Sequence, residues 1–150
     1  MKTSKYLILA AVVIAAIGIW GWQAPNDTEA DTSDSEAPAH VEPMEGTELS
    51  RVTLTDKAAE RLDIQTTEAA DASVDGATRR VIPYSAVIYD AAGKTWTYTS
   101  PEPLVFVRAA IVVERIDGDM AILTEGPDVG TLVVTVGGVM LFGTEFGVGH

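Results

Sequence analysis

The sequence predicts a mainly β protein, a small roll or barrel with one short helix, which follows an N-terminal membrane helix and a disordered acidic linker. Turn residues recur about every ten positions between short apolar runs in residues 49–150, as in small β rolls and barrels. Residues 6–22 carry no charge, and residues 23–48 hold eight acids with no Lys or Arg. The chain therefore divides into 1–22, 23–48 and 49–150.

Composition excludes several classes of function. The formal net charge of −12 repels nucleic acid phosphates, so no nucleic acid partner is expected. The absence of cysteine removes disulfides, thiolate metal sites and cysteine nucleophiles. The only two histidines, His40 and His150, stand in the linker and at the chain end, which leaves little for a catalytic triad or a histidine metal site. We expect a non-enzymatic protein with no catalytic residue, cofactor or resident metal.

Residues 1–22 form the predicted membrane anchor. Residues 6–22 would reach roughly 25 Å as a helix, at the short end of what spans a bilayer. Trp20 and Trp22 suit a membrane interface, and the following residues match a signal-peptidase site poorly, which favours an uncleaved anchor over a cleaved signal. Lys2 and Lys5 orient the N-terminus inward. The expected location is the cytoplasmic membrane, single-pass, with the C-terminal domain periplasmic.

Residues 23–48 are interpreted as a disordered acidic linker, because they contain almost no large apolar side chain to offset the entropy of ordering. One cluster in this stretch offers imidazole, carboxylate and thioether ligands: His40, Glu42, Met44 and Glu45. Flexible ligands at irregular spacing bind metal weakly, so a solvated spacer is the preferred interpretation.

The folded part begins with a predicted strand at 51–54. Thr55 is a suitable N-cap for a helix over 56–62, and Asp56 suits the positive end of the helix dipole. Residues 64–67 resume as a strand, and the small, acidic stretch 68–78 is predicted to be a loop.

The next elements are expected to be strands. Strands are predicted at 79–82 and 86–89 around Pro83, then a hairpin connection at 90–94. Residues 95–99 alternate strictly, which places Trp96 and Tyr98 on one face. Further strands are predicted at 104–114, with Arg108 as the only interior charge, and at 120–123 and 131–136. Residues 137–150 form a Gly-rich tail with scattered apolar side chains.

Several short motifs occur in an order known from one protein family. They are Val52-Thr53-Leu54-Thr55, Ala58 to Ile64, Val81-Ile82-Pro83-Tyr84-Ser85-Ala86-Val87, Trp96-Thr97-Tyr98, and Gly126–Gly130 leading into Val133 to Gly137. Together they resemble the β-barrel and membrane-proximal parts of periplasmic adaptor subunits, the membrane fusion proteins of resistance-nodulation-division efflux pumps. The resemblance covers roughly residues 49–150. The lipoyl-like domain and helical hairpin of a full adaptor have no room in 150 residues.

The resemblance implies a membrane-anchored adaptor-like protein that contacts an inner-membrane efflux transporter, with a homo-oligomer as an option. The residues expected to contact the partner lie in the tail: Gly143, Phe146, Gly147, Val148 and His150. The alternative for the apolar tail residues Phe142, Phe146 and Val148 is that they close the domain's own core.

The alternative function is an extracytoplasmic domain that binds a small ligand or a heavy metal. Its candidate ligands are His150, Met120, Met140 and Glu145, although strand methionines usually fill cores. Asp117 and Asp119 flank Gly118 and suit a solvated turn rather than a catalytic pair. The arginines Arg79, Arg80 and Arg108 are expected to form local ion pairs.

Overall fold

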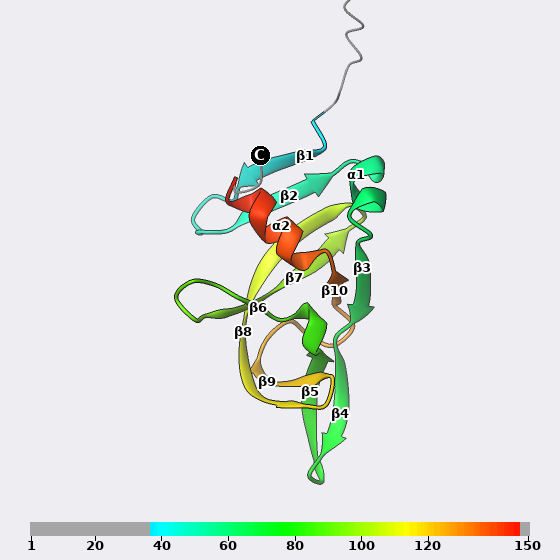
Figure 1. The fold of residues 1–150 in the computed structure, drawn as a ribbon. Helices are drawn as coiled ribbons and strands as arrows, with labels where there is room; N and C mark the ends of the chain where they lie inside the picture. The colour runs from blue at the N-terminus through cyan, green and yellow to red at the C-terminus, as the bar shows by residue number, and fades with distance from the viewer. Residues whose placement is uncertain (1–36, 148–150) are drawn as a thin grey trace, which may run out of the picture. The chain divides into compact units, whose positions relative to one another are not determined.

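The structure is a computed structural model, and it describes residues 37–147. These residues are mainly β, which confirms the predicted class, and their strands form one strongly curled sheet (Figure 1). The strands are β1 (Ala39–Pro43), β2 (Ser50–Leu54), β3 (Gln65–Glu68), β4 (Ala70–Val74), β5 (Ala77–Pro83), β6 (Ile88–Tyr89), β7 (Thr95–Glu102), β8 (Val105–Asp117), β9 (Met120–Glu125) and β10 (Leu132–Val136). All pairings are antiparallel.

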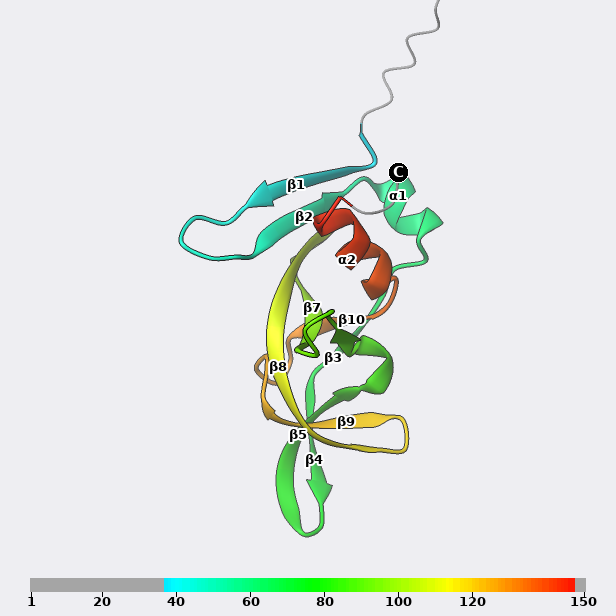
Figure 2. The same cartoon turned by 60° about the vertical axis from the view of Figure 1, so that its left-hand side comes forward.

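Strand β8 joins the two parts of the sheet. Its first half pairs with β7 on one edge and with β2 on the other, whereas its second half pairs with β9. Register shifts between Val112 and Arg115 bend β8 just beyond its pairing with Thr95, the first residue of β7, because a bulge increases local twist. Figure 2 shows β8 passing from the region beneath α2 to β9 and β5. The order along the main path is β3-β10-β7-β8-β9-β5-β4.

Two buried clusters lie on opposite faces of this sheet, and neighbouring residues of β10 show the division. Val134 belongs to the cluster that packs under the two helices, together with Tyr98, Phe106 and Leu141. Val133 belongs to the cluster enclosed by the curl of β5 and β9. Because successive side chains of a strand point to opposite faces, one strand contributes to both cores.

The helix α1 (Asp56–Arg61) forms as predicted. The Thr55 hydroxyl accepts a hydrogen bond from the Ala58 amide at 3.2 Å, so Thr55 is the N-cap. Asp56 lies in the first turn and Arg61 in the last, both favourable for the helix dipole. A short 3-10 turn (Tyr84–Ala86) follows β5. A strand was expected over 86–89, but only Ile88 and Tyr89 pair as a strand, β6.

Two segments differ from the predictions. The expected disordered linker over 23–48 is wrong for its last part, because Ala39–Pro43 form β1, which pairs with the edge of β2. The expected loop over 68–78 is a hairpin of β4 and β5 that turns at Asp75 and Gly76. Both turn residues have positive φ, 53° and 79°, as two-residue hairpin turns require.

The C-terminal segment also differs from the prediction. Where a Gly-rich tail was expected, Gly138–Glu145 form the helix α2, which contacts β2, β1 and β7. Figure 1 shows α2 at the opposite end of the described region from the β4–β5 hairpin. Leu141 is fully buried and anchors the helix in the core beneath it.

Within residues 37–147, the structure has no helix that is both long and apolar enough to cross a bilayer. The predicted anchor at 1–22, the first part of the acidic linker, and Val148 and His150 lie outside the described residues.

Gly137 fixes the turn into α2 and provides a test of the fold. Its φ is +86°, and a Cβ there would overlap with Ile64 Cδ1, whereas Gly130 has φ +87° and open space around it. Gly130→Ala should cost about 1 kcal/mol of unfolding free energy from backbone strain alone. Gly137→Ala should cost about 1 kcal/mol more, because the end of the Ile64 side chain must shift and the Leu62 carbonyl oxygen lies 3.3 Å from the added Cβ. Urea unfolding of both variants checks this, and equal losses would contradict the described packing of α2.

Candidate functional site

The main polar feature of the interior is a cluster beneath α2, defined here as Tyr98, Arg108 and Glu145. Tyr98 and Arg108 are directly opposed in the β7–β8 register, so their side chains leave the same face of the sheet. Trp96 lies two residues before Tyr98 and shares that face. Glu145 reaches the cluster from the last turn of α2. The sequence predicts the shared face of Trp96 and Tyr98 and an interior charge at Arg108, but their contact with Glu145 arises only in the folded structure.

The cluster contains a buried ion pair. Arg108 Nε lies 3.2 Å from Glu145 Oε2, and the two side chains are 6% and 2% exposed. Arg108 Nε is buried and forms no hydrogen bond within residues 37–147, so the contact is an ion pair alone. The Tyr98 hydroxyl donates a short hydrogen bond to the same carboxylate oxygen. The carboxylate therefore receives both a positive charge and a proton donor, which compensates for its removal from water.

Aromatic rings surround the guanidinium of Arg108. Its Cζ atom lies 4.0 Å from the centroid of the Trp96 ring and 5.0 Å from that of Phe146. Phe142 completes this aromatic enclosure at 5.8 Å and packs against Phe146, with their ring centroids 4.7 Å apart. Cation–π attraction favours these positions, and it strengthens when water is excluded. Arg108 thus joins α2 to the sheet through the rings of Phe142 and Phe146 as well as through Glu145, while Trp96 covers it from β7.

The position of Glu145 is unfavourable for an isolated helix, because a negative charge at the last turn faces the negative end of the helix dipole. Arg108 offsets that repulsion from the sheet side.

Burial raises the pKa of the Tyr98 phenol well above its usual value near 10, and the hydrogen bond to Glu145 raises it further. Tyr98 therefore stays protonated and acts as a donor to the carboxylate.

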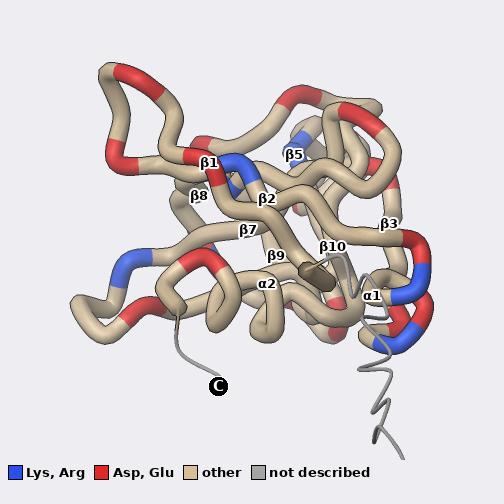
Figure 3. Tube along the Cα trace, turned by 90° about the horizontal axis from the view of Figure 1, so that it is seen from above, with Lys and Arg blue, Asp and Glu red and all other residues tan. Residues whose placement is uncertain are grey.

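The outer face of α2, defined here as Val139, Met140, Gly143 and Phe146, has the opposite character. Val139 is 72% exposed, Met140 57% and Phe146 51%. The only charged residue of the helix, Glu145, points inward. In the charge-coloured view of Figure 3, acidic segments lie mainly in turns and loops, while most of α2 carries no charge. The helix therefore has reversed polarity, with its charge inside and apolar side chains in water.

The predicted partner-contact residues fall partly on this face. Gly143 and Phe146 belong to it, and Gly147 is exposed directly after the helix. Phe146 packs over the guanidinium of Arg108 and is also 51% exposed, so it covers the domain's own cluster while part of its ring faces solvent. Val148 and His150 lie outside the described residues.

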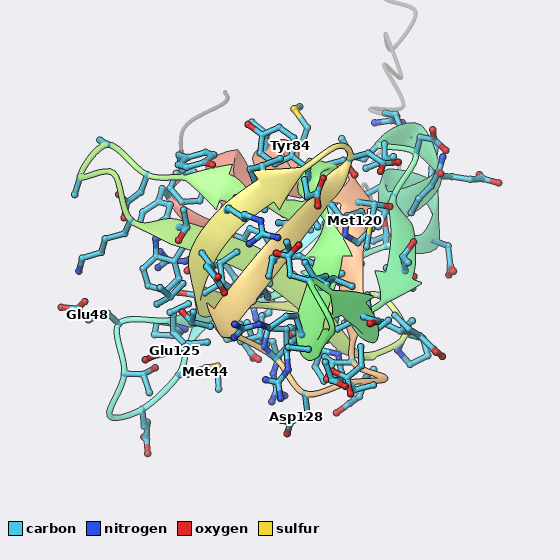
Figure 4. The ribbon with its side chains drawn as sticks, turned by 90° about the horizontal axis from the view of Figure 1, so that it is seen from below. Met44, Glu48, Tyr84, Met120, Glu125 and Asp128 are labelled. Carbon is cyan, nitrogen blue, oxygen red and sulfur yellow. The ribbon has the colours of Figure 1, made fainter. Side chains whose placement is uncertain are left out.

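The candidate heavy-metal ligands do not meet in the described structure. Glu145 is bound to Tyr98 and Arg108, whereas Met140 lies on the outer face of α2. Met120 is in β9, and Figure 4 shows it well separated from Met44 of the β1–β2 loop. Residues 37–147 contain no group of three or more His, Cys, Asp or Glu side chains placed to hold a metal ion.

Other candidates lie in exposed or paired positions. His40 is 3.3 Å from Glu42 on the solvent side of β1. Asp117, the last residue of β8, and Asp119, in the turn after it, are both exposed. The prediction of local ion pairs is confirmed, because Arg79 pairs with Glu114, and Arg80 with Asp128, which is labelled in Figure 4.

Comparisons of the chain with protein-family models, with curated proteins and with solved structures found no match.

The buried pair makes a prediction about stability. Glu145→Gln removes the negative charge and leaves Arg108 buried without a counter-ion, which should cost about 3–5 kcal/mol. Arg108→Met should cost a similar amount, because it leaves Glu145 unpaired. The double variant should lose less than the sum of the single losses, since neither charge then remains. A double-mutant cycle by urea unfolding measures this, and additive losses would contradict a coupled pair.

The phenol of Tyr98 predicts a pH dependence. The folded state holds this proton to higher pH than the unfolded state, so its stabilising contribution is complete below about pH 10 and declines above it. The unfolding free energy of the parent protein should fall from pH 10 upward, and Tyr98→Phe should reduce that slope. Tyr84 and Tyr89 are exposed neighbours, and desolvation together with their interaction raises the pKa of Tyr89, so the control is the double variant Tyr84→Phe/Tyr89→Phe, which should keep the part of the slope that Tyr98 causes. Identical slopes for Tyr98→Phe and the parent would contradict the assignment.

Proposed function

We propose that this protein is a non-enzymatic, membrane-anchored adaptor of the membrane-fusion kind, which associates with an efflux or export transporter. In this proposal, residues 1–22 hold it in the cytoplasmic membrane, an acidic linker follows, and the β-roll or barrel domain acts on the periplasmic side. The resemblance of residues 49–150 to adaptor subunits supports the class, and the mainly β structure is consistent with it.

The observation that carries the proposal is the reversed polarity of α2. Val139, Met140 and Phe146 expose apolar surface that a monomer would ordinarily bury, and contiguous exposed apolar patches mark interaction sites. The buried pair of Glu145 and Arg108 fixes the helix in this orientation. The outer face of α2 is thus a preorganised, uncharged contact surface, and preorganisation lowers the entropy lost on binding.

The chemistry of this face indicates the kind of surface that would receive it. The partner offers an apolar groove for the side chains of Val139, Met140 and Phe146, as in other helix-in-groove complexes. Gly143 has no side chain and allows close approach of the partner there. Residues 51–150 hold fourteen acids and eight bases, so a groove bordered by Lys or Arg would complement the domain and increase the association rate.

The buried cluster suits a structural role better than a catalytic one. A general base would most naturally be the Glu145 carboxylate. Its side chain is only 2% exposed, and it already accepts a hydrogen bond from the Tyr98 hydroxyl. Its ion pair with Arg108 lies beneath the helix and joins two elements. The proposal therefore assigns these residues to positioning the contact surface.

Crosslinking in native membranes tests the proposal with the full-length, anchored chain. Val139→Lys and Met140→Lys place charge on the outer face of α2 without touching the core, and Val129→Lys does the same at an exposed valine of the β9–β10 turn. We expect the parent and Val129→Lys to crosslink to a transporter subunit identified by mass spectrometry, and the two α2 variants to lose at least about ten-fold of that product.

Folding is checked in the same samples by urea unfolding, which should be unchanged within about 0.5 kcal/mol for all three exposed sites. Recovery of the protein alone, or equal crosslinking of the α2 variants and the parent, would contradict the proposal.

A further inference from the structure

A groove separate from the outer face of α2 opens where β8 bends away from the first residues of β7. It has a volume of about 620 Å³, within the range of small-molecule sites. The register places Tyr89, Thr95 and Ile111 side by side across β6, β7 and β8. Val113 continues that row along β8, and Trp96 and Val112 also line the groove. Its walls are therefore aromatic and aliphatic.

The rim of the groove is held by the carboxylate of Asp90. This carboxylate accepts hydrogen bonds from the Ala92 amide at 2.8 Å, the Lys94 amide at 2.9 Å and Trp96 Nε1 at 2.9 Å. The Trp96 indole is fixed a second time by the guanidinium of Arg108, which stacks over its ring. Both the loop carrying Lys94 and the aromatic wall are thus set before any ligand arrives, which lowers the ordering cost of binding.

Lys94 supplies the charge of the groove. It is the only ionised side chain among the lining residues, and it makes no ion pair within residues 37–147. Asp90 lies close to it and stays negatively charged, with a pKa lowered mainly by the hydrogen bond from Trp96, but its carboxylate accepts three N–H hydrogen bonds and does not line the groove. Tyr89 is exposed and contributes an aromatic ring to the lining.

We infer that this groove binds a small amphipathic anion, an aromatic carboxylate of drug-like size, with its ring against Tyr89 and Val113 and its carboxylate at Lys94. Charge complementarity decides the class. A cation would be repelled by Lys94, and a neutral apolar molecule would form no ion pair with its ammonium group. The inference does not depend on the proposed transporter contact, because it uses a different surface and different residues.

The test uses 2-naphthoate as the probe and the full-length protein in phosphatidylcholine nanodiscs, with 2-naphthylmethylammonium as the probe of opposite charge. Amide and indole N–H resonances are followed by NMR during titration. We expect saturable shifts at Gly93, Lys94, Thr95 and the Trp96 indole for naphthoate, and several-fold weaker binding for the cation. Resonances of α2 beyond the cluster report independently on the proposed contact surface.

Two lysine variants distinguish binding at Lys94 from a general effect of the protein's net charge on anion binding. Lys94→Gln should weaken naphthoate binding several-fold, whereas Lys57→Gln, at an exposed lysine of α1, should leave it unchanged. Tyr89→Ser should also weaken it, through loss of the ring. The inference is overturned by an absence of saturable shifts in the groove, by equal binding of the two probes, or by unchanged binding in Lys94→Gln.

Discussion

The buried contact between Arg108 and Glu145 is the interaction on which the arrangement of this domain depends. Burying a charge costs several kcal/mol unless it is paired, and here each charge is compensated only when α2 lies on the sheet. The helix itself is weak, because two of its eight residues are glycine and no side chain caps its N-terminus. Its stability therefore comes from Leu141 in the core and from the charged and aromatic contacts of Arg108, rather than from local propensity.

This arrangement links the interior to the surface. Because Glu145 is drawn inward, the opposite side of α2 must face water, and that side carries Val139, Met140 and Phe146. Trp96 extends the same link to the groove at the bend of β8, since one indole contacts both Arg108 and Asp90. The two surfaces for which we propose ligands are thus supported by one buried network, although they lie on different elements.

The sequence predicts those parts of the fold in which local pattern and tertiary packing agree. The alternation at Trp96 and Tyr98, the cap at Thr55 and the turns near Gly118 and Gly130 each correspond to a structural element. The hairpin of β4 and β5 was missed because β4 and the first residues of β5 are largely exposed on both faces, although Asp75-Gly76 is a strong hairpin signal. Helix α2 was missed because its glycines and uniform apolarity resemble a loop. The partner of Arg108 could not be found from pattern, since Glu145 is distant in sequence and meets it only through packing.

Amide hydrogen exchange of the full-length protein tests the central claim most directly. If the buried pair fixes α2, the amides of Leu141 and Phe142 should exchange about as slowly as those in the centre of β7 and β8, through global unfolding. In Glu145→Gln, exchange in α2 should become faster by orders of magnitude, while β7 and β8 keep a separate, slower rate. Rapid exchange of α2 in the parent protein, or equal protection in the parent and the variant, would contradict the account.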